Sequence, residues 1–170
     1  MTDKTTDDFR SVASVMEDIV SEYNDLASNT RKVLQEKLKV LFSKFFEAHP
    51  QIKTIHWLQY TPYFNDGDEC EFGVHEAYFT KTEWSDIDCV YGEDDEGLVE
   101  FRDHFEYVNG KSTCIPRVCE DDPTLIMDIK SLVSIINSEV NEDVIRMMFG
   151  DHVWVRAHRD DFEIQDYDHD

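Results

Sequence analysis

The spacing of the apolar residues changes about a third of the way along this chain, and this change constrains the fold more than any other feature. Between Phe9 and Phe46 the apolar residues recur at steps of three and four, the period of one face of an α-helix. From Ile55 they alternate with their neighbours, which is the period of a β-strand. Helical spacing returns after Pro123, and alternation returns after Gly150. Helices and strands in this order predict an α+β fold.

The N-terminal part is predicted to form an antiparallel helical hairpin, with helices over about 7–27 and 30–48. The polar run Ser28-Asn29-Thr30 offers a break and a new N-cap, and Pro50 ends the second helix. Because these caps are weak, one continuous helix of about forty residues is the alternative. Residues 28–53 hold six basic and two acidic side chains. That surplus suits neutralisation of acidic neighbours inside the fold, self-association of the N-terminal helices, or a separate anion-binding patch.

The rest of the chain is predicted to complete one domain, because 170 residues suit a single domain. Hairpins are expected over about 53–79 and 152–167, the first with a turn at Asn65-Asp66-Gly67-Asp68. Helices are expected over about 123–139 and 142–149, and residues 80–121 read as an irregular acidic region. Tight turns between strands favour an antiparallel sheet of about four strands with helices covering one face.

Acidic residues dominate the surface chemistry. The chain has 38 Asp and Glu against 16 Lys and Arg, a formal net charge of −22. Such a surface repels nucleic acids and anionic membranes and attracts basic protein surfaces. We therefore expect a basic partner, and no direct binding of nucleic acid or membrane. The predicted partner-binding residues are Asp86, Asp88, Glu93, Asp94, Asp95, Glu96, Asp160, Asp161, Glu163, Asp166, Asp168 and Asp170.

Signs of catalysis are few. We find no glycine-rich phosphate loop and no Gly-x-Ser-x-Gly nucleophile elbow, so no catalytic residue is assigned and no cofactor is expected. The weak candidates for a metal site are Asp66, Asp68, Glu71 and His75, because hard cations bind several oxygen ligands. Turn chemistry also explains the first two of these residues. The four cysteines lack C-x-x-C spacing, and no stretch approaches 18 apolar residues. These features favour a cytoplasmic protein with reduced thiols.

Two stretches resemble a known group of proteins. YTPYFNDGDECEF, within HWLQYTPYFNDGDECEFGVHE, and the ending FGDHVWVRAHRDDFEIQDYDHD are together similar to small acidic proteins encoded by tailed bacteriophages and prophages. The resemblance covers about a quarter of the chain, and it carries no catalytic residues. It implies a viral origin and expression in the cytoplasm of a bacterial host. Proteins of this kind are often inhibitors of host or defence enzymes.

Three functional hypotheses follow. The leading one is a non-enzymatic protein that binds a basic surface of a nucleic-acid-handling bacterial enzyme and inhibits it, as a mimic of nucleic-acid phosphate. The first alternative is a metal-dependent hydrolase or nuclease built on the Asp66–Glu71 region. The second is a virion or assembly component that forms a homodimer through its N-terminal helices.

Overall fold

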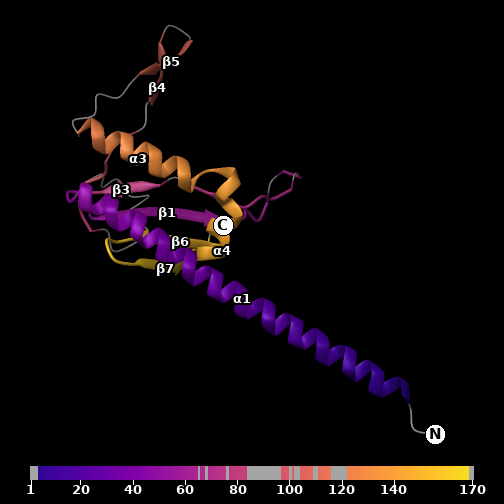
Figure 1. Cartoon of the computed structure of the whole chain (residues 1–170). Coiled ribbons are helices and arrows are strands. Elements are labelled where there is room, and N and C mark those ends of the chain that lie inside the picture. Colours follow the sequence, from indigo (N-terminus) through magenta and orange to yellow (C-terminus); the bar gives the residue numbers. More distant parts are fainter. Residues whose placement is uncertain are drawn as a thin grey trace. The chain divides into compact units, whose positions relative to one another are not determined.

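A computed structural model describes residues 4–64, 66–67, 69–75, 77–83, 97–99, 101, 104–108, 111–115 and 122–168. The chain divides into two compact units, Met1–Leu38 and Lys39–Asp170. The second unit holds the sheet and the shorter helices (Figure 1). Its combination of helices with an antiparallel sheet confirms the α+β prediction.

Helix α1 runs without interruption from Lys4 to Ala48. The predicted hairpin of two helices is therefore wrong, and the continuous helix is correct. The physical reason lies in the residues at the expected break, since Ser, Asn and Thr cost a helix only a few tenths of a kcal/mol each relative to Ala. Neither Gly nor Pro occurs between Lys4 and Ala48, so nothing forces the chain out of helical angles.

A five-stranded antiparallel sheet forms the centre of the second unit. Its strand order is β2-β1-β6-β7, and β3 also pairs with β1. The bounds are β1 Thr54–Tyr60, β2 Gly73–Val74, β3 Tyr78–Thr80, β6 Val153–Ala157 and β7 Phe162–Asp166. Both predicted hairpins are confirmed, because β1 pairs antiparallel with β2 and β3, and β6 pairs antiparallel with β7. The contact of β1 with β6 joins the two hairpins into one sheet.

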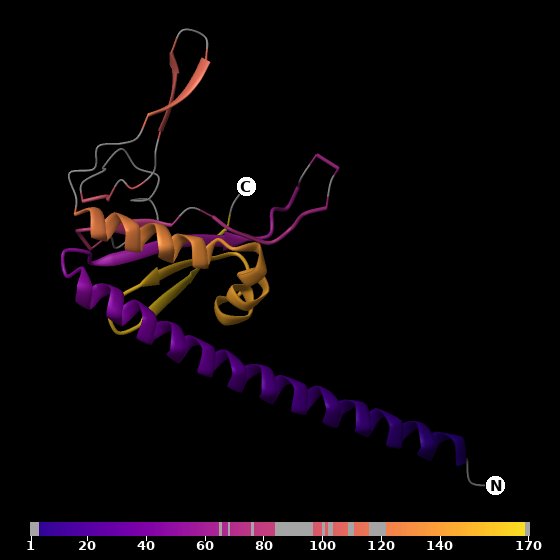
Figure 2. The same ribbon diagram turned by 45° about the horizontal axis from the view of Figure 1, so that its top comes forward.

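The second unit also contains three helical elements and a small separate hairpin. Helix α3 spans Pro123–Ile136 with Asp122 as its N-cap, η1 spans Glu139–Asn141, and α4 spans Glu142–Phe149 (Figure 2). Both predicted helices are confirmed, although the first ends earlier than expected. The description of 80–121 as irregular was incomplete, because β4 (His104–Val108) and β5 (Lys111–Ile115) form a separate two-stranded hairpin. Among the described residues, no helix is long and apolar enough to cross a membrane.

One face of the sheet packs against helices through aromatic rings. The indole of Trp57 on β1 lies 6.0 Å from the Phe42 ring of α1 and 5.4 Å from the Phe149 ring of α4. Phe162 on β7 joins the same group, 5.3 Å from Phe42. Trp57 and Phe42 are at most 1% exposed. Burying such rings supplies much of the stability of a domain of this size, and they hold the C-terminal end of α1 against the sheet.

Candidate binding surfaces

The acidic residues at the end of the chain lie on the β6–β7 hairpin and just beyond it. Asp160 and Asp161 form the turn, Glu163 and Asp166 belong to β7, and Asp168 follows that strand. The other predicted partner-binding residues lie outside the described residues: Asp86, Asp88, Glu93, Asp94, Asp95, Glu96 and Asp170. The described part of the predicted acidic surface therefore lies on this hairpin and directly after it.

Two of these carboxylates are neutralised by nearby bases. Lys39 Nζ lies 3.0 Å from Asp161 Oδ1, and the guanidinium of Arg156 pairs with Glu163. The hydrogen bond from Lys39 lowers the pKa of Asp161, and the hydrogen bond from Arg156 lowers the pKa of Glu163. The first pair could not be predicted from the sequence, because its lysine belongs to α1, far away in the chain. These two acids therefore add little to the uncompensated charge.

The remaining three acids of the hairpin are more open. Asp160 and Asp166 are exposed, and no described basic residue forms an ion pair with either of them. Asp168 is also exposed, and Tyr63 donates a hydrogen bond of 3.4 Å to its Oδ1. These residues keep their negative charge available to a partner.

A cleft beside the hairpin turn has mixed charge. Its volume is about 500 Å³, and its polar lining includes Lys53, Arg159 and Asp160. Phe46 and Ile52 supply part of its apolar lining. Because acids and bases share this lining, the cleft does not form a purely anionic groove.

A group of stacked rings lies at the C-terminal end of β1, and we call it the ring cluster: Tyr60, Tyr63, His75, His152 and Tyr167. The imidazole of His75 stacks on Tyr60 with centroids 3.8 Å apart, and His152 stacks on Tyr63 at 4.7 Å. Tyr167 lies 5.6 Å from Tyr60. Burial raises the pKa of Tyr60.

Asp151 fixes the backbone beside the ring cluster. Its two carboxylate oxygens accept hydrogen bonds from the amide and hydroxyl of Thr61 at 2.8 and 2.7 Å. Arg146 Nη2 donates to the same carboxylate at 2.6 Å, and the amide of His152 donates at 2.9 Å. Burial alone would raise the pKa of Asp151, but the hydrogen bonds from Thr61 and the charge of Arg146 lower it. His152 adopts a φ of 54°, an uncommon value for a residue with a side chain. The carboxylate of Asp151 holds this conformation in place.

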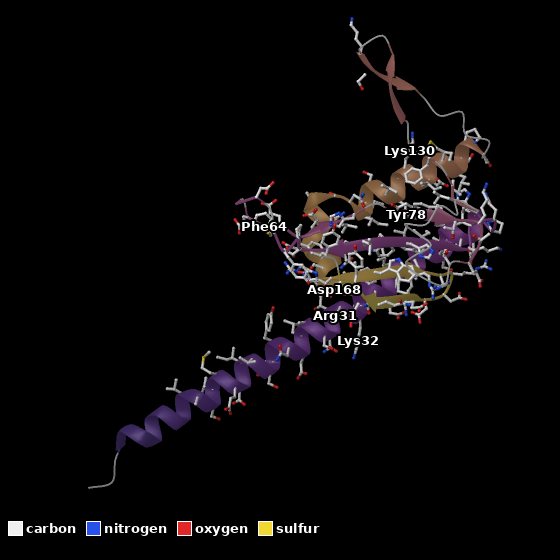
Figure 3. The ribbon with its side chains drawn as sticks, turned by 180° about the vertical axis from the view of Figure 1, so that it is seen from behind. Arg31, Lys32, Phe64, Tyr78, Lys130 and Asp168 are labelled. Atoms are coloured by element: carbon white, nitrogen blue, oxygen red, sulfur yellow. The ribbon has the colours of Figure 1, made fainter. Side chains whose placement is uncertain are left out.

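The ring cluster continues into an exposed aromatic surface. Tyr63 is 64% exposed, and Phe64 beside it is 76% exposed. Figure 3 labels Phe64 in the loop that follows β1, and Asp168 after the end of β7. We define Tyr63, Phe64, Asp166 and Asp168 as the acidic-aromatic edge. Sequence analysis does not single out these two aromatic residues, because the exposure of a ring in a loop leaves no sign in the sequence.

A buried histidine occupies the opposite side of β1 from Trp57. His56 is fully buried, its ring stacks on Trp154 at 5.3 Å, and its Nε2 lies 2.6 Å from the Thr54 hydroxyl. Burial, helped by the charge of Arg156, lowers the pKa of His56 to about 3. A histidine in this state is neutral at physiological pH and acts as a packing residue.

The candidate metal ligands do not come together in the described part of the chain. Asp68 lies outside the described residues, and Asp66 occupies a turn with a φ of 39°. The imidazole of His75 stacks on the ring of Tyr60. Among the described residues, no group of three His, Cys, Asp or Glu side chains is placed to hold a metal ion.

Comparison with known proteins adds no relative. No family model, no curated protein and no solved structure matches this chain.

Proposed function

We propose that this protein is a non-enzymatic binding protein whose acidic-aromatic edge docks onto a basic surface of another protein. The carrying observation is the chemistry of that edge: the exposed Tyr63 donates a hydrogen bond to the exposed carboxylate of Asp168, and Phe64 and Asp166, close to these two residues in the chain, are exposed as well. An arginine side chain suits such a surface, because its guanidinium stacks on aromatic faces and pairs with carboxylates. Exposed aromatic residues are also frequent anchors in protein interfaces.

The net charge of −22 supports a basic partner for a second reason. Several described bases already form ion pairs with acids of the same chain: Lys39 with Asp161, Arg146 with Asp151, and Arg156 with Glu163. The surplus charge must therefore remain on the outside, where it accelerates association with a cationic partner.

The class of partner follows from the same charge. A protein that binds nucleic acid presents a basic cleft, and a folded acidic chain can occupy that cleft as a mimic of phosphate. The resemblance to phage proteins makes a bacterial defence or host enzyme, met in the bacterial cytoplasm, the first class to screen. Binding at the cleft would inhibit that enzyme by excluding its nucleic acid.

Affinity capture from a bacterial lysate, followed by binding measurements on the captured protein, tests the proposal. We expect the affinity to fall at least tenfold between 50 and 300 mM salt, as for other charge-driven contacts, and we expect duplex DNA to compete. The double variant D166N/D168N and the variant F64A should each weaken binding. The control E22Q/D25N removes equal charge from exposed positions of α1 and should have a smaller effect. A partner whose binding ignores salt, DNA and these variants would contradict the proposal.

A further inference from the structure

A stripe of apolar side chains is exposed along residues 12–38 of α1. Six of its members are between 52% and 68% exposed: Val12, Met16, Ile19, Tyr23, Leu26 and Val33. Contiguous apolar surface of this kind usually marks an interaction site. A helix in water also owes most of its stability to the packing of such a face. We therefore expect this stripe to pack against another protein surface.

The spacing of the stripe is that of a coiled coil. From Val12 the positions advance by four, three, four and three residues to Leu26, and the same steps continue through Thr30 and Val33 to Lys37. This is a heptad repeat in which the two core positions face one partner helix. Ala13, Val20, Ala27 and Leu34 lie directly beside the core positions and widen the apolar face on one side.

The charges along the same segment indicate which helix covers it. The first half carries four exposed acids and no base, at Glu17, Asp18, Glu22 and Asp25. The second half carries Arg31, Lys32 and Lys37 against the single acid Glu36 (Figure 3 labels the first two). A second copy running antiparallel sets each acidic half against a basic half. A parallel copy would set acid against acid, which is unfavourable.

One antiparallel register satisfies both patterns within residues 12–37. It places Met16 opposite Val33 and Tyr23 opposite Leu26. Ile19 then lies opposite Thr30, and Val12 lies opposite Lys37 at the end, where the long lysine stem can reach water. Glu17 and Asp18 lie on the outer side of the helix, at the same level as Arg31 and Lys32 of the second copy, so the oppositely charged halves attract each other without direct ion pairs. The edge formed by Ala13, Val20, Ala27 and Leu34 meets its own counterpart, so the widened apolar face is covered as well.

We propose that residues 12–37 of α1 pair with the same segment of a second copy of this chain in an antiparallel coiled coil. This pairing buries the exposed stripe and neutralises the two charged halves of the helix. It is independent of the acidic-aromatic edge, which belongs to the other unit of the chain.

Sedimentation equilibrium of the full chain tests the pairing. We expect a species of twice the 20.0 kDa monomer mass at micromolar concentration. The variant L26E places a charge in the core of the proposed seam and should raise the dimer Kd at least tenfold. The control S21E adds the same charge on the opposite side of the helix and should leave the Kd unchanged. Circular dichroism establishes that both variants keep their fold. A wild-type monomer, or a dimer indifferent to L26E, would overturn the proposal.

Disulfide cross-linking between two single-cysteine variants tests the orientation. The proposed register places Met16 of one copy opposite Val33 of the other, whereas a parallel pair places each residue opposite its own copy. We expect an oxidised mixture of the M16C and V33C chains to form mainly the mixed disulfide, identified by mass spectrometry of the linked peptides. If each variant instead forms disulfides mainly with its own copy at these positions, the helices are parallel and the antiparallel pairing is wrong.

Discussion

Helix α3 and residues 12–38 of α1 carry the same sequence pattern but differ completely in burial. In α3 the apolar stripe of Leu125, Ile129, Leu132 and Ile136 is at most 4% exposed. In α1 the members from Val12 to Leu26 are all more than half exposed. The comparison teaches that periodicity specifies a face without specifying what covers it. For α3 the cover belongs to the same chain, and for α1 we infer that it belongs to a second copy.

Matched isoleucines give the largest expected difference between the two regions. Ile129 is fully buried in α3, whereas Ile19 is 52% exposed in α1. Ile129→Ala should lower the free energy of unfolding by about 2–5 kcal/mol, because it leaves a cavity in packed surroundings. Ile19→Ala should cost less than about 1 kcal/mol in dilute solution, where the chain is monomeric. Urea denaturation at submicromolar concentration measures both, and equal costs would break the comparison.

The pH dependence of stability gives the next effect, because a buried titratable group lies in the second unit. The pKa of His56 is about 3 in the folded protein, below the usual 6.5 of the unfolded chain. Between these two pH values His56 binds a proton in the unfolded state but not in the folded state. The stability that the neutral His56 provides is therefore fully present above pH 6.5 and is lost progressively as the pH decreases toward 3. The slope from this group approaches about 1.4 kcal/mol per pH unit. The variant H56Q should lose this part of the slope in denaturation curves between pH 7.5 and 4.5. Identical slopes would show that His56 does not contribute.

Matched aspartates sharpen the comparison further. Asp151 accepts hydrogen bonds from Thr61, His152 and Arg146, whereas Asp25 is exposed on α1. Asp151→Ala should cost about 1–3 kcal/mol, as expected for hydrogen bonds to a charged group. Asp25→Ala should change stability by less than about 0.5 kcal/mol. Thermal and chemical unfolding report both values, and a negligible effect of D151A would remove the structural role assigned to Asp151.

The pair between Lys39 and Asp161 gives the smallest expected effect. The side chain of Asp161 is 73% exposed, so water and salt screen the interaction. A double-mutant cycle with K39A and D161A should give a coupling energy below about 1 kcal/mol that decreases with added salt. A coupling above about 2 kcal/mol would mean that the pair is shielded from water.

The sequence was sufficient for the parts of the fold that depend on local chemistry. Pro123 after Asp122 marked the start of α3, and Gly150 marked the end of α4, because capping acts within one turn of helix. Alternation placed β1 and β6 correctly. The prediction of a helix break at Ser28-Asn29-Thr30 was wrong, because these residues are weak helix formers but do not interrupt a helix.

The candidate site depended on contacts that no local pattern encodes. The acidic run at 160–168 read as uncompensated charge, but Lys39 and Arg156 neutralise two of its members from other strands and helices. The ring cluster requires Tyr60, His75 and His152 to meet from three separate segments. Such meetings follow from the register of β1 with its neighbours, and the sequence does not determine that register directly.

The most direct test is hydrogen exchange measured as a function of protein concentration. It asks whether the apolar stripe of α3 is buried by the same chain and that of residues 12–38 by a second copy. Amides of α3 should be protected at every concentration, because their cover is intramolecular. Amides of residues 12–38 should exchange rapidly in dilute solution and become protected as the concentration rises through the dimer Kd. Protection of residues 12–38 that is strong and independent of concentration would contradict the account, because the cover would then lie within a single chain.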